Sequence, residues 1–278
     1  MLIADRDTGD VGLGTAQFAF RNGSAEDSVA TVHAALDAGI KLIDTALAYT
    51  RANMESYAEH VVARALKGVS GERPLVATKG GHWRDGDRFP VDGRPETLRR
   101  HCHISLRTLQ TDRIDLYQLH HVDPVVPLAD SVGALEQLRR EGKIAAIGLS
   151  NVSVSQLDEA LAVGPIAAVQ NRLSWADPRD LPTALASAQR GVTYLAYSPF
   201  GGHSGMPPAP ALALAERYGV SVHRVLVAWL RAQSANIVPL AGASRPASIR
   251  DSATLLDLMG YRQADWRITS SGSKMTCL

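Results

Sequence analysis

Residues 115–150 read DLYQLHHVDPVVPLADSVGALEQLRREGKIAAIGLS. The stretch opens with a short apolar run, Asp115–His120, continues as a helical pattern over Leu128–Arg140, and closes with a second apolar run, Ile144–Ser150. Gly142 follows the helical pattern, as glycine commonly does at the end of a helix. Parallel strands need a crossover connection, which is usually a helix. The stretch therefore predicts one strand–helix–strand unit of a parallel α/β sheet.

The same alternation runs along most of the chain. We expect eight strands, over Val11–Gln17, Lys41–Thr45, Pro74–Lys79, Asp115–His120, Ile144–Ser150, Ala167–Asn171, Val192–Ser198 and Ile237–Gly242. Helical patterns lie between and after them, over Ala25–Ala38, Ser56–Lys67, Pro95–Leu109, Leu128–Arg140, Ser153–Leu161, Leu181–Gln189, Ala209–Tyr218, Ser221–Gln233 and Pro246–Leu258. Eight strand–helix units predict a closed (β/α)8 TIM barrel, an α/β fold that usually takes about 250 residues. We therefore expect residues 1–278 to form one domain, with a frayed tail over 260–278 because the sequence there is largely polar and aperiodic.

An open, doubly wound sheet is the competing architecture for alternating strands and helices. That fold normally carries a glycine-rich phosphate-binding turn between its first strand and its first helix. Residues 12–17 read GLGTAQ, which lacks the third glycine of this fingerprint and lies well before the next helical pattern. The closed barrel is therefore the favoured interpretation.

Composition and charge exclude several classes of partner. The chain has 29 Lys and Arg against 28 Asp and Glu, and neither sign forms a long block, so we expect no nucleic-acid partner. No apolar run approaches the roughly 18 residues of a membrane span, and the amino end lacks the basic and apolar regions of an export signal. We therefore expect a cytoplasmic protein without a membrane partner. Cys102 and Cys277 are too few for a disulfide framework or a cysteine-rich metal site, and we expect no metal.

Polar residues end several of the predicted strands, and these are the first candidates for chemistry. Asp44, Lys79 and His120 stand at the carboxyl ends of three successive strands, and Tyr49 lies in the loop after Asp44. The active site of a barrel enzyme forms at the carboxyl ends of its strands, so we expect these four side chains to meet. Each residue alone has an ordinary structural explanation, such as a carboxylate that caps a loop.

The sequence around these residues resembles that of the aldo-keto reductases. The matching motifs keep the order and the spacing of that family: LIDTA at 42–46 with Tyr49 after it, ATK at 77–79, DLYQLH at 115–120, GK at 142–143, IGLSN at 147–151, VQN at 169–171, AYSPF at 196–200 and GASRP at 242–246. The resemblance implies hydride transfer between NADP(H) and a small-molecule carbonyl or alcohol.

The resemblance also implies a role for each of the four candidates. A carbonyl that accepts hydride develops negative charge on its oxygen, so a positioned proton donor lowers the barrier. Tyr49 is expected to be that donor, and the ammonium of Lys79 is expected to lower its pKa from the ordinary value of about 10. Asp44 would hold Lys79 in an ion pair, and His120 would donate a hydrogen bond to the carbonyl oxygen.

Further positions match the residues with which the family binds its cofactor. Ser150, Asn151 and Gln170 would hold the nicotinamide carboxamide, and Tyr197 would stack on the ring. The adenosine 2′-phosphate would contact Ser244 and Arg245, which predicts NADP(H) rather than NAD(H). The other expected contacts are Thr15, Asp44, Ser198, Phe200, Gly201, Gly202, Gly242, Ser248, Asp251 and Ser252.

The loop after Tyr197 is short, which predicts a partly open cofactor site with Gly201 and Gly202 near the phosphates. We expect Phe18, Trp83 and His121 to line the substrate pocket, because they lie near predicted strand ends. The sequence does not specify the substrate, and we expect a monomer or a weak homo-oligomer.

Two other functions are compatible with part of this pattern. Lys79 could be the Schiff-base nucleophile of a barrel lyase, although the motifs at Ser150, Gln170 and Arg245 would then have no explanation. The chain could also be an NADP(H)-binding regulatory or sensor subunit, like the potassium-channel β subunits that resemble the same family.

Overall fold

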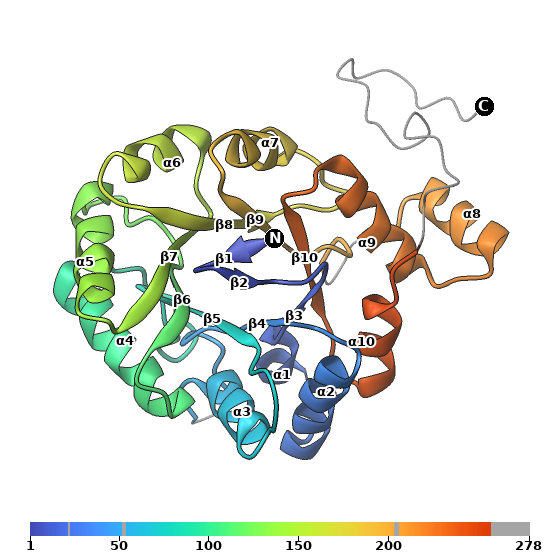
Figure 1. The fold of residues 1–278 in the computed structure, drawn as a ribbon, viewed down its shortest axis with the longest axis horizontal. Helices are drawn as coiled ribbons and strands as arrows, with labels where there is room; N and C mark the ends of the chain where they lie inside the picture. The colour runs from blue at the N-terminus through green and yellow to red at the C-terminus, as the bar shows by residue number, and fades with distance from the viewer. Residues whose placement is uncertain (22, 52–53, 203–205, 257–278) are drawn as a thin grey trace.

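The computed structural model describes residues 1–21, 23–51, 54–202 and 206–256. In this part of the chain, eight parallel strands close into a barrel in the order β10-β3-β4-β5-β6-β7-β8-β9 (Figure 1). The barrel strands are β3 (Gly12–Gly14), β4 (Leu42–Asp44), β5 (Leu75–Gly80), β6 (Ile114–Leu119), β7 (Ile144–Ser150), β8 (Ile166–Arg172), β9 (Thr193–Tyr197) and β10 (Ile237–Gly242). The predicted (β/α)8 TIM barrel is confirmed.

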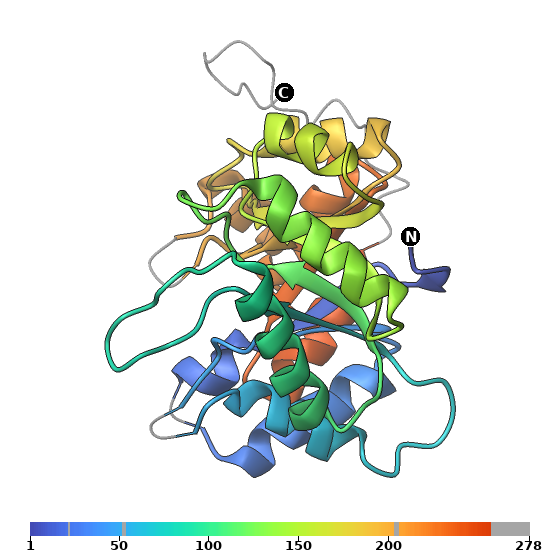
Figure 2. The same cartoon turned by 90° about the vertical axis from the view of Figure 1, so that its left-hand side faces the viewer.

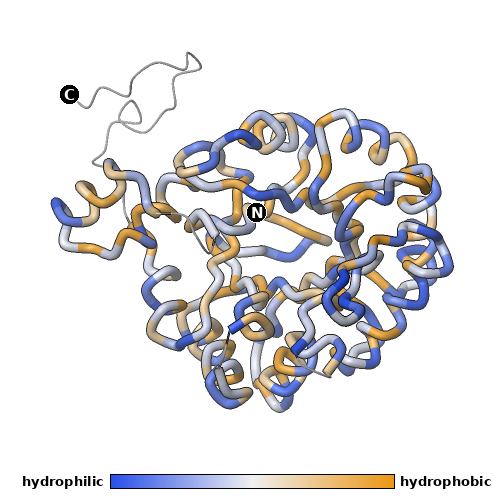
Figure 3. The backbone as a smooth tube through the Cα atoms, turned by 180° about the vertical axis from the view of Figure 1, so that it is seen from behind, coloured by the Kyte–Doolittle hydropathy of each residue, from blue (hydrophilic) through white to orange (hydrophobic). Residues whose placement is uncertain are grey.

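Helices surround the barrel, and Figure 2 shows them from the side. They are α1 (Ala16–Phe20), α2 (Ala25–Asp37), α3 (Tyr57–Leu66), α4 (Pro95–Leu109), α5 (Leu128–Arg140), α6 (Val154–Leu161), α7 (Leu181–Gln189), α8 (Ala209–Tyr218), α9 (Val222–Gln233) and α10 (Pro246–Ala253). Ser24 and Ser153 begin α2 and α6 with capping boxes, in which the serine hydroxyl accepts a backbone N–H of the first turn. Hydrophobic and hydrophilic residues alternate along the helices, as expected where one face of each packs on the barrel (Figure 3).

Most predicted elements exist with bounds within one or two residues of those expected, but the first strand is shorter. The strand predicted over Val11–Gln17 ends at Gly14, because Thr15 leaves the extended conformation with φ −99° and ψ 2°. The Phe18 N–H then donates to the Thr15 carbonyl at 2.9 Å, and helix α1 forms instead. At the other end of the chain, α10 ends at Ala253 rather than at 258, and residues 257–258 and the tail 260–278 lie outside the described residues.

A small hairpin that the sequence did not reveal closes the amino-terminal end of the barrel. Strands β1 (Leu2–Ile3) and β2 (Arg6–Asp7) pair antiparallel and lie across the barrel axis in Figure 1. The Ile3 side chain is fully buried and packs on the residues that point into the barrel, namely Leu42, Leu75, Ala77, Leu116, Ala146, Ala168, Leu195, Val238 and Leu240. This end of the barrel is therefore filled, which leaves the carboxyl ends of the strands for a site. No helix in the described ranges is long and apolar enough to cross a membrane.

Candidate active site

The structure brings the four strand-end candidates together at the carboxyl rim of the barrel. Asp44 is the last residue of β4, Lys79 lies in β5, and His120 directly follows β6. All three side chains are buried, and Lys79 is 0% exposed. Tyr49 lies in the loop after β4, where its backbone N–H donates to the Ala46 carbonyl at 3.1 Å. Adjacent parallel strands thus supply the group in the way that the barrel topology predicts.

The ammonium of Lys79 is at the centre of this group. Its Nζ donates to both carboxylate oxygens of Asp44 and to the carbonyl of Thr45, each at 2.8 Å. A fourth contact, at 3.3 Å, joins Nζ to the hydroxyl of Tyr49. An ammonium has three protons to donate, so the carboxylate, the carbonyl and the phenol fully satisfy it.

The pKa of Lys79 is raised above its ordinary value. Burial alone would lower the pKa of this lysine, but the Asp44 carboxylate and the Tyr49 hydroxyl outweigh that effect. Lys79 is therefore a permanent cation inside the barrel at neutral pH.

The pKa of Tyr49 is also raised, contrary to the sequence-based expectation. Burial of the hydroxyl is the largest effect, and the Asp44 carboxylate adds to it, while Lys79 lowers the pKa by less than the two combined. The lowered pKa was expected from the charge of Lys79 alone, whereas the loss of solvation on burial has the larger effect. Tyr49 consequently keeps its proton at neutral pH, as a proton donor must.

His120 is a neutral imidazole beside the phenol. The two rings meet edge to face with centroids 6.1 Å apart. Burial, together with the charge of Lys79, holds the pKa of His120 well below its ordinary value. Its Nδ1 is buried and has no hydrogen-bond partner among the described residues.

Asp44 is held by two glutamine side chains from other strands of the barrel. Gln170, on β8, donates its Nε2 to Asp44 Oδ1 at 2.7 Å, and Gln118, on β6, donates to the same atom at 3.4 Å. The sequence analysis missed Gln118, although it stands two residues before His120 and strand alternation puts both side chains on one face. Gly148 leaves room for it, because a Cβ there would lie 2.7 Å from Gln118 Cγ.

A cavity of about 1000 Å³ opens in front of this group. The predicted site residues that line it are Asp44, Tyr49, His120, His121, Ser150, Asn151, Gln170, Tyr197, Ser198, Phe200, Gly202, Gly242, Ser244, Arg245, Ser248, Asp251 and Ser252. The sequence analysis did not single out several other lining residues, among them Gln17, Phe20, Arg21 and His223.

Five of the predicted residues do not line this cavity: Lys79, which is fully buried and contacts the lining residues Asp44 and Tyr49, and four others. Phe18 is 2% exposed and belongs to the core, because the turn into α1 presents Phe20 to the cavity instead. Trp83 packs edge to face on His101, with centroids 5.4 Å apart, in the loop after β5. Thr15 is buried and donates its hydroxyl to the Asp44 carbonyl at 3.0 Å.

Gly201 is the last of these residues, and it lies just outside the lining. Its carbonyl accepts a hydrogen bond of 3.1 Å from Arg172, at the end of β8, which holds the loop after β9. The prediction of a partly open site depends in part on residues 203–205, which lie outside the described residues.

The polar residues at the ends of β7, β8 and β9 form one hydrogen-bonded network. The Ser150 hydroxyl donates to the Gln170 carbonyl at 2.8 Å, and the Asn151 amide donates to the His120 carbonyl at 3.0 Å. The Tyr197 hydroxyl donates to Asn151 Oδ1 at 2.8 Å. Asn151 has a left-handed backbone (φ 59°), a conformation that asparagine tolerates better than most residues. These contacts hold the amide and hydroxyl groups that border the cavity.

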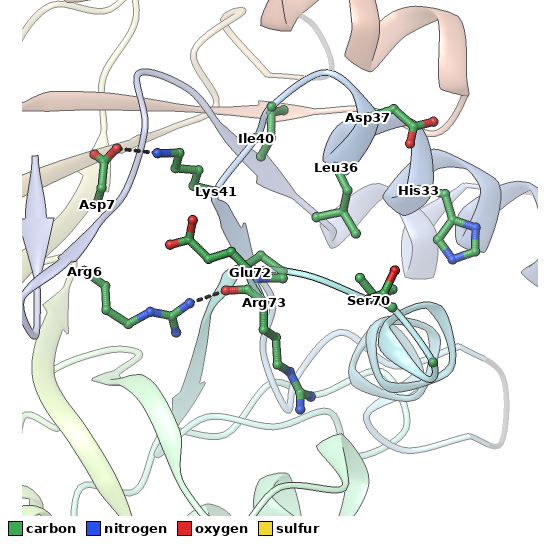
Figure 4. Close-up of a pocket in the computed structure, with 14 residues that line it drawn as sticks. Arg6, Asp7, His33, Leu36, Asp37, Ile40, Lys41, Ser70, Glu72 and Arg73 are labelled. Carbon is green, nitrogen blue, oxygen red and sulfur yellow. Dashed lines mark hydrogen bonds and ion pairs between the residues drawn. The ribbon is translucent and has the colours of Figure 1, made fainter.

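A second cavity, of about 480 Å³, lies at the opposite end of the barrel (Figure 4). Two of its basic side chains are engaged in contacts with other lining residues. Lys41 binds Asp7 at 2.8 Å, and Arg6 donates to the Arg73 carbonyl. None of the described residues that line it belongs to the group around Lys79. The candidate active site is therefore the group at the carboxyl rim.

Comparison with known proteins agrees with this geometry. The model of the family described as "Aldo/keto reductase family" matches residues 10–206, which include all four clustered residues. The chain belongs to the aldo/keto reductase family.

Relatives of this aldo/keto reductase span much of its length. The 6-dehydroglucose reductase of Novosphingobium aromaticivorans is 33% identical over 260 residues, which cover 86% of this chain and 83% of the relative. A probable aldo-keto reductase of Glycine max is 31% identical over 257 residues, covering 79% and 72% of the two chains.

Solved structures of other aldo-keto reductases have the same fold. The glycerol dehydrogenase of Gluconobacter oxydans is 27% identical with a TM-score of 0.79 and covers 98% of this chain and 97% of its own. An aldo/keto reductase of Klebsiella pneumoniae, solved with NADP and acetate, is 25% identical with a TM-score of 0.78, covering 97% and 95%.

The buried ion pair makes a prediction about stability. Asp44→Asn leaves the Lys79 ammonium without its counter-charge, so we expect it to lower the free energy of unfolding by about 3–5 kcal/mol. The double variant Asp44→Asn/Lys79→Met removes both charges and should recover most of this loss. Chemical denaturation measures both, with Glu26→Gln, in the exposed pair with Arg64, as the control that changes little. Equal stability of Asp44→Asn and the unmodified protein would contradict the prediction.

Proposed function

We propose that this protein is an NADP(H)-dependent oxidoreductase that interconverts a carbonyl group and an alcohol, with Tyr49 as the general acid and base. The observation that carries the proposal is the placement of the Tyr49 hydroxyl 3.3 Å from the Lys79 ammonium, on the wall of the large cavity and beside His120. A small carbonyl compound that enters this cavity would meet a phenol and an imidazole side by side.

The four residues would divide the work of proton transfer. Tyr49 holds a proton at neutral pH and would donate it to the carbonyl oxygen as negative charge develops there. Lys79 would then stabilise the phenolate that remains, and Asp44 keeps that ammonium charged and fixed. His120 is neutral and has one N–H to donate, which would orient the carbonyl oxygen.

NADP(H), when bound, would supply or accept the hydride. The cavity is at the upper end of the usual size of ligand sites, about 300–1000 Å³, and its donor set fits this cofactor. Ser150, Asn151 and Gln170 offer amide and hydroxyl groups for a carboxamide, and the ring of Tyr197 offers a flat apolar face. The aldo/keto reductase of Klebsiella pneumoniae, which shares the fold, was solved with NADP.

The preference for a phosphorylated cofactor would come from the start of α10. Arg245 precedes this helix as an exposed side chain, next to Ser244, and both line the cavity. A helix amino end together with a guanidinium favours a phosphate group. We assign these residues to the 2′-phosphate.

The two other functions are less well supported. A Schiff-base lyase needs a neutral amine, but the Asp44 carboxylate keeps the pKa of Lys79 raised and its amine protonated. A sensor subunit would bind NADPH without turnover across a broad panel of aldehydes, and a steady-state assay with such a panel separates it from an enzyme.

The first prediction from this proposal concerns the proton donor. Tyr49→Phe removes the hydroxyl, so we expect kcat for aldehyde reduction to fall by at least about 10²–10⁴-fold. The Kd for NADPH should stay within a few-fold, as measured by fluorescence titration. Tyr218→Phe, at the exposed end of α8, is the matched control and should keep full activity. Retained turnover in Tyr49→Phe would reject the assignment.

The second prediction concerns the cofactor phosphate. Arg245→Leu should weaken NADPH binding by roughly ten- to a hundredfold, the usual range for losing hydrogen bonds to a charged group. NADH binding should barely change, because it lacks that phosphate. Arg250→Leu is the matched control, since Arg250 lies on the same helix and pairs with Asp37. If the wild-type protein binds NADH and NADPH equally, Arg245 does not have this role.

A further inference from the structure

Glu59 is an ionisable residue that the proposed mechanism does not use, and its carboxyl group is buried behind strand β5. It belongs to the first turn of α3 and is 0% exposed. Its Oε1 accepts a hydrogen bond of 2.6 Å from the hydroxyl of Thr78. Thr78 and Lys79 are consecutive residues of β5, so their side chains lie on opposite faces of the strand. Glu59 therefore contacts the outer face of the strand whose inner face carries the ammonium.

A carboxyl group in this place is costly. Burial raises the pKa of Glu59, and three surrounding hydroxyl groups, together with the charge of Lys79, offset only part of that rise. An apolar side chain of the same length, such as that of methionine, would fill the place without the loss of polar hydration. The hydrogen bond to Thr78 is what distinguishes the carboxyl group from such a side chain.

The start of α3 also holds the segment that carries Tyr49. The Ala58 backbone N–H donates to the Tyr49 carbonyl at 3.1 Å. The Ser56 hydroxyl donates to the Leu47 carbonyl at 3.5 Å. Ala58 directly precedes Glu59 in the helix. The position of the Tyr49 backbone is therefore linked to the position of α3.

Strand β5 holds the same segment from inside the barrel. The Leu47 backbone N–H donates to the Lys79 carbonyl at 3.4 Å, and the Lys79 ammonium donates to the Thr45 carbonyl at 2.8 Å. The Tyr49 hydroxyl lies 3.3 Å from that ammonium, just beyond the usual N–H···O range of about 2.7–3.2 Å. A small displacement of α3 away from β5 would lengthen this contact further and weaken it.

We propose that Glu59 is a positioning residue for the reaction: its hydrogen bond with Thr78 joins α3 to β5 and thereby keeps the Tyr49 hydroxyl against the Lys79 ammonium. This inference rests on the proposed function. Glu59 is not among the residues that line the large cavity, so it acts through Thr78 and the two elements. The carboxyl group can accept from Thr78 whether or not it is ionised, because a protonated carboxyl group keeps acceptor capacity.

One variant should keep this hydrogen bond, and another should remove it. Glu59→Gln keeps an acceptor in the same place, since the amide oxygen of glutamine can accept from Thr78. The double variant Glu59→Met/Thr78→Val replaces both partners with apolar groups of similar shape, a change that can leave stability nearly unaltered. Thr78→Val alone removes the same bond and is measured beside it. Thr183→Val is the matched control, because the Thr183 hydroxyl donates to Asp180 at 2.8 Å at the start of α7.

The readout is kcat for reduction of the aldehyde that the wild-type protein turns over fastest, with NADPH as the cofactor. It is calculated per NADPH-binding site from a fluorescence titration, so unfolded protein is not counted. We expect kcat to fall by roughly ten- to a hundredfold in both variants that remove the bond, since a misplacement of about 1 Å can cost this much. The KM for the aldehyde and the Kd for NADPH should change far less. Glu59→Gln and Thr183→Val should keep a kcat close to that of the wild-type protein.

A wild-type kcat per site in the double variant or in Thr78→Val overturns the inference. An equal fall in Glu59→Gln, or in the control, does so as well. These outcomes leave the proposed function intact as long as Tyr49→Phe loses its turnover in the same assay. Absence of turnover in the wild-type protein, or retained turnover in Tyr49→Phe, overturns the proposed function and the inference together.

Discussion

The ion pair between Lys79 and Asp44 is the constraint on which the site depends. A charge inside a barrel is costly unless it is paired and hydrogen-bonded, and here three contacts of 2.8 Å satisfy the ammonium. The carboxylate in turn accepts from Gln170, on the far side of the barrel. The pair joins the neighbouring strands β4 and β5, and the hydrogen bond from Gln170 is added only when β8 has closed the barrel opposite them. The fold and the site therefore depend on each other. The barrel positions the two charges, and either charge without its partner would destabilise the barrel.

Burial next to this pair decides the protonation of Tyr49. Burial removes the water that would solvate the phenolate, which raises the pKa of Tyr49. The charge of Lys79 stabilises the phenolate, but it offsets only part of this rise. The result is a phenol that keeps its proton and lies beside a fixed cation, which would stabilise the phenolate once the proton is donated. Electrostatic preorganisation of this kind needs no reorganisation when charge develops on a bound carbonyl oxygen. A neutral His120 completes the arrangement without adding a second positive charge.

The parts of the structure that the sequence predicted are those with a strong periodic signal. Helix α4 and strand β7 have the predicted bounds, since Pro95 marks the start of the helix and an apolar run marks the strand. The strand ends put Asp44, Lys79 and His120 together, because a closed parallel barrel leaves no other arrangement. The alternation of side chains along β6 places Gln118 on the same face as His120, so the sequence indicated its orientation. Its contact with Asp44 was visible only in the structure.

Elements too short to carry a period were not predictable in the same way. The hairpin of β1 and β2 has only two residues in each strand. It is recognised by its packing in the folded structure, where Ile3 fills the end of the barrel. Likewise, the turn at Thr15 decides whether Phe18 or Phe20 faces the cavity, and no local pattern specifies that turn. The raised pKa of Tyr49 depends on burial, which neighbouring residues in the sequence do not reveal.

The most direct measurement of the central claim is the pH profile of kcat for NADPH-dependent aldehyde reduction. The mechanism that we propose needs Tyr49 in its acid form, and burial raises the pKa above the ordinary value of about 10, so the acid form is lost only above that pH. We therefore expect kcat to stay level from neutral pH through about pH 9 and to fall only at higher pH. A fall in kcat with a midpoint between about pH 7 and 8, absent from the profile of protein stability, would contradict the claim that the site keeps its phenol protonated.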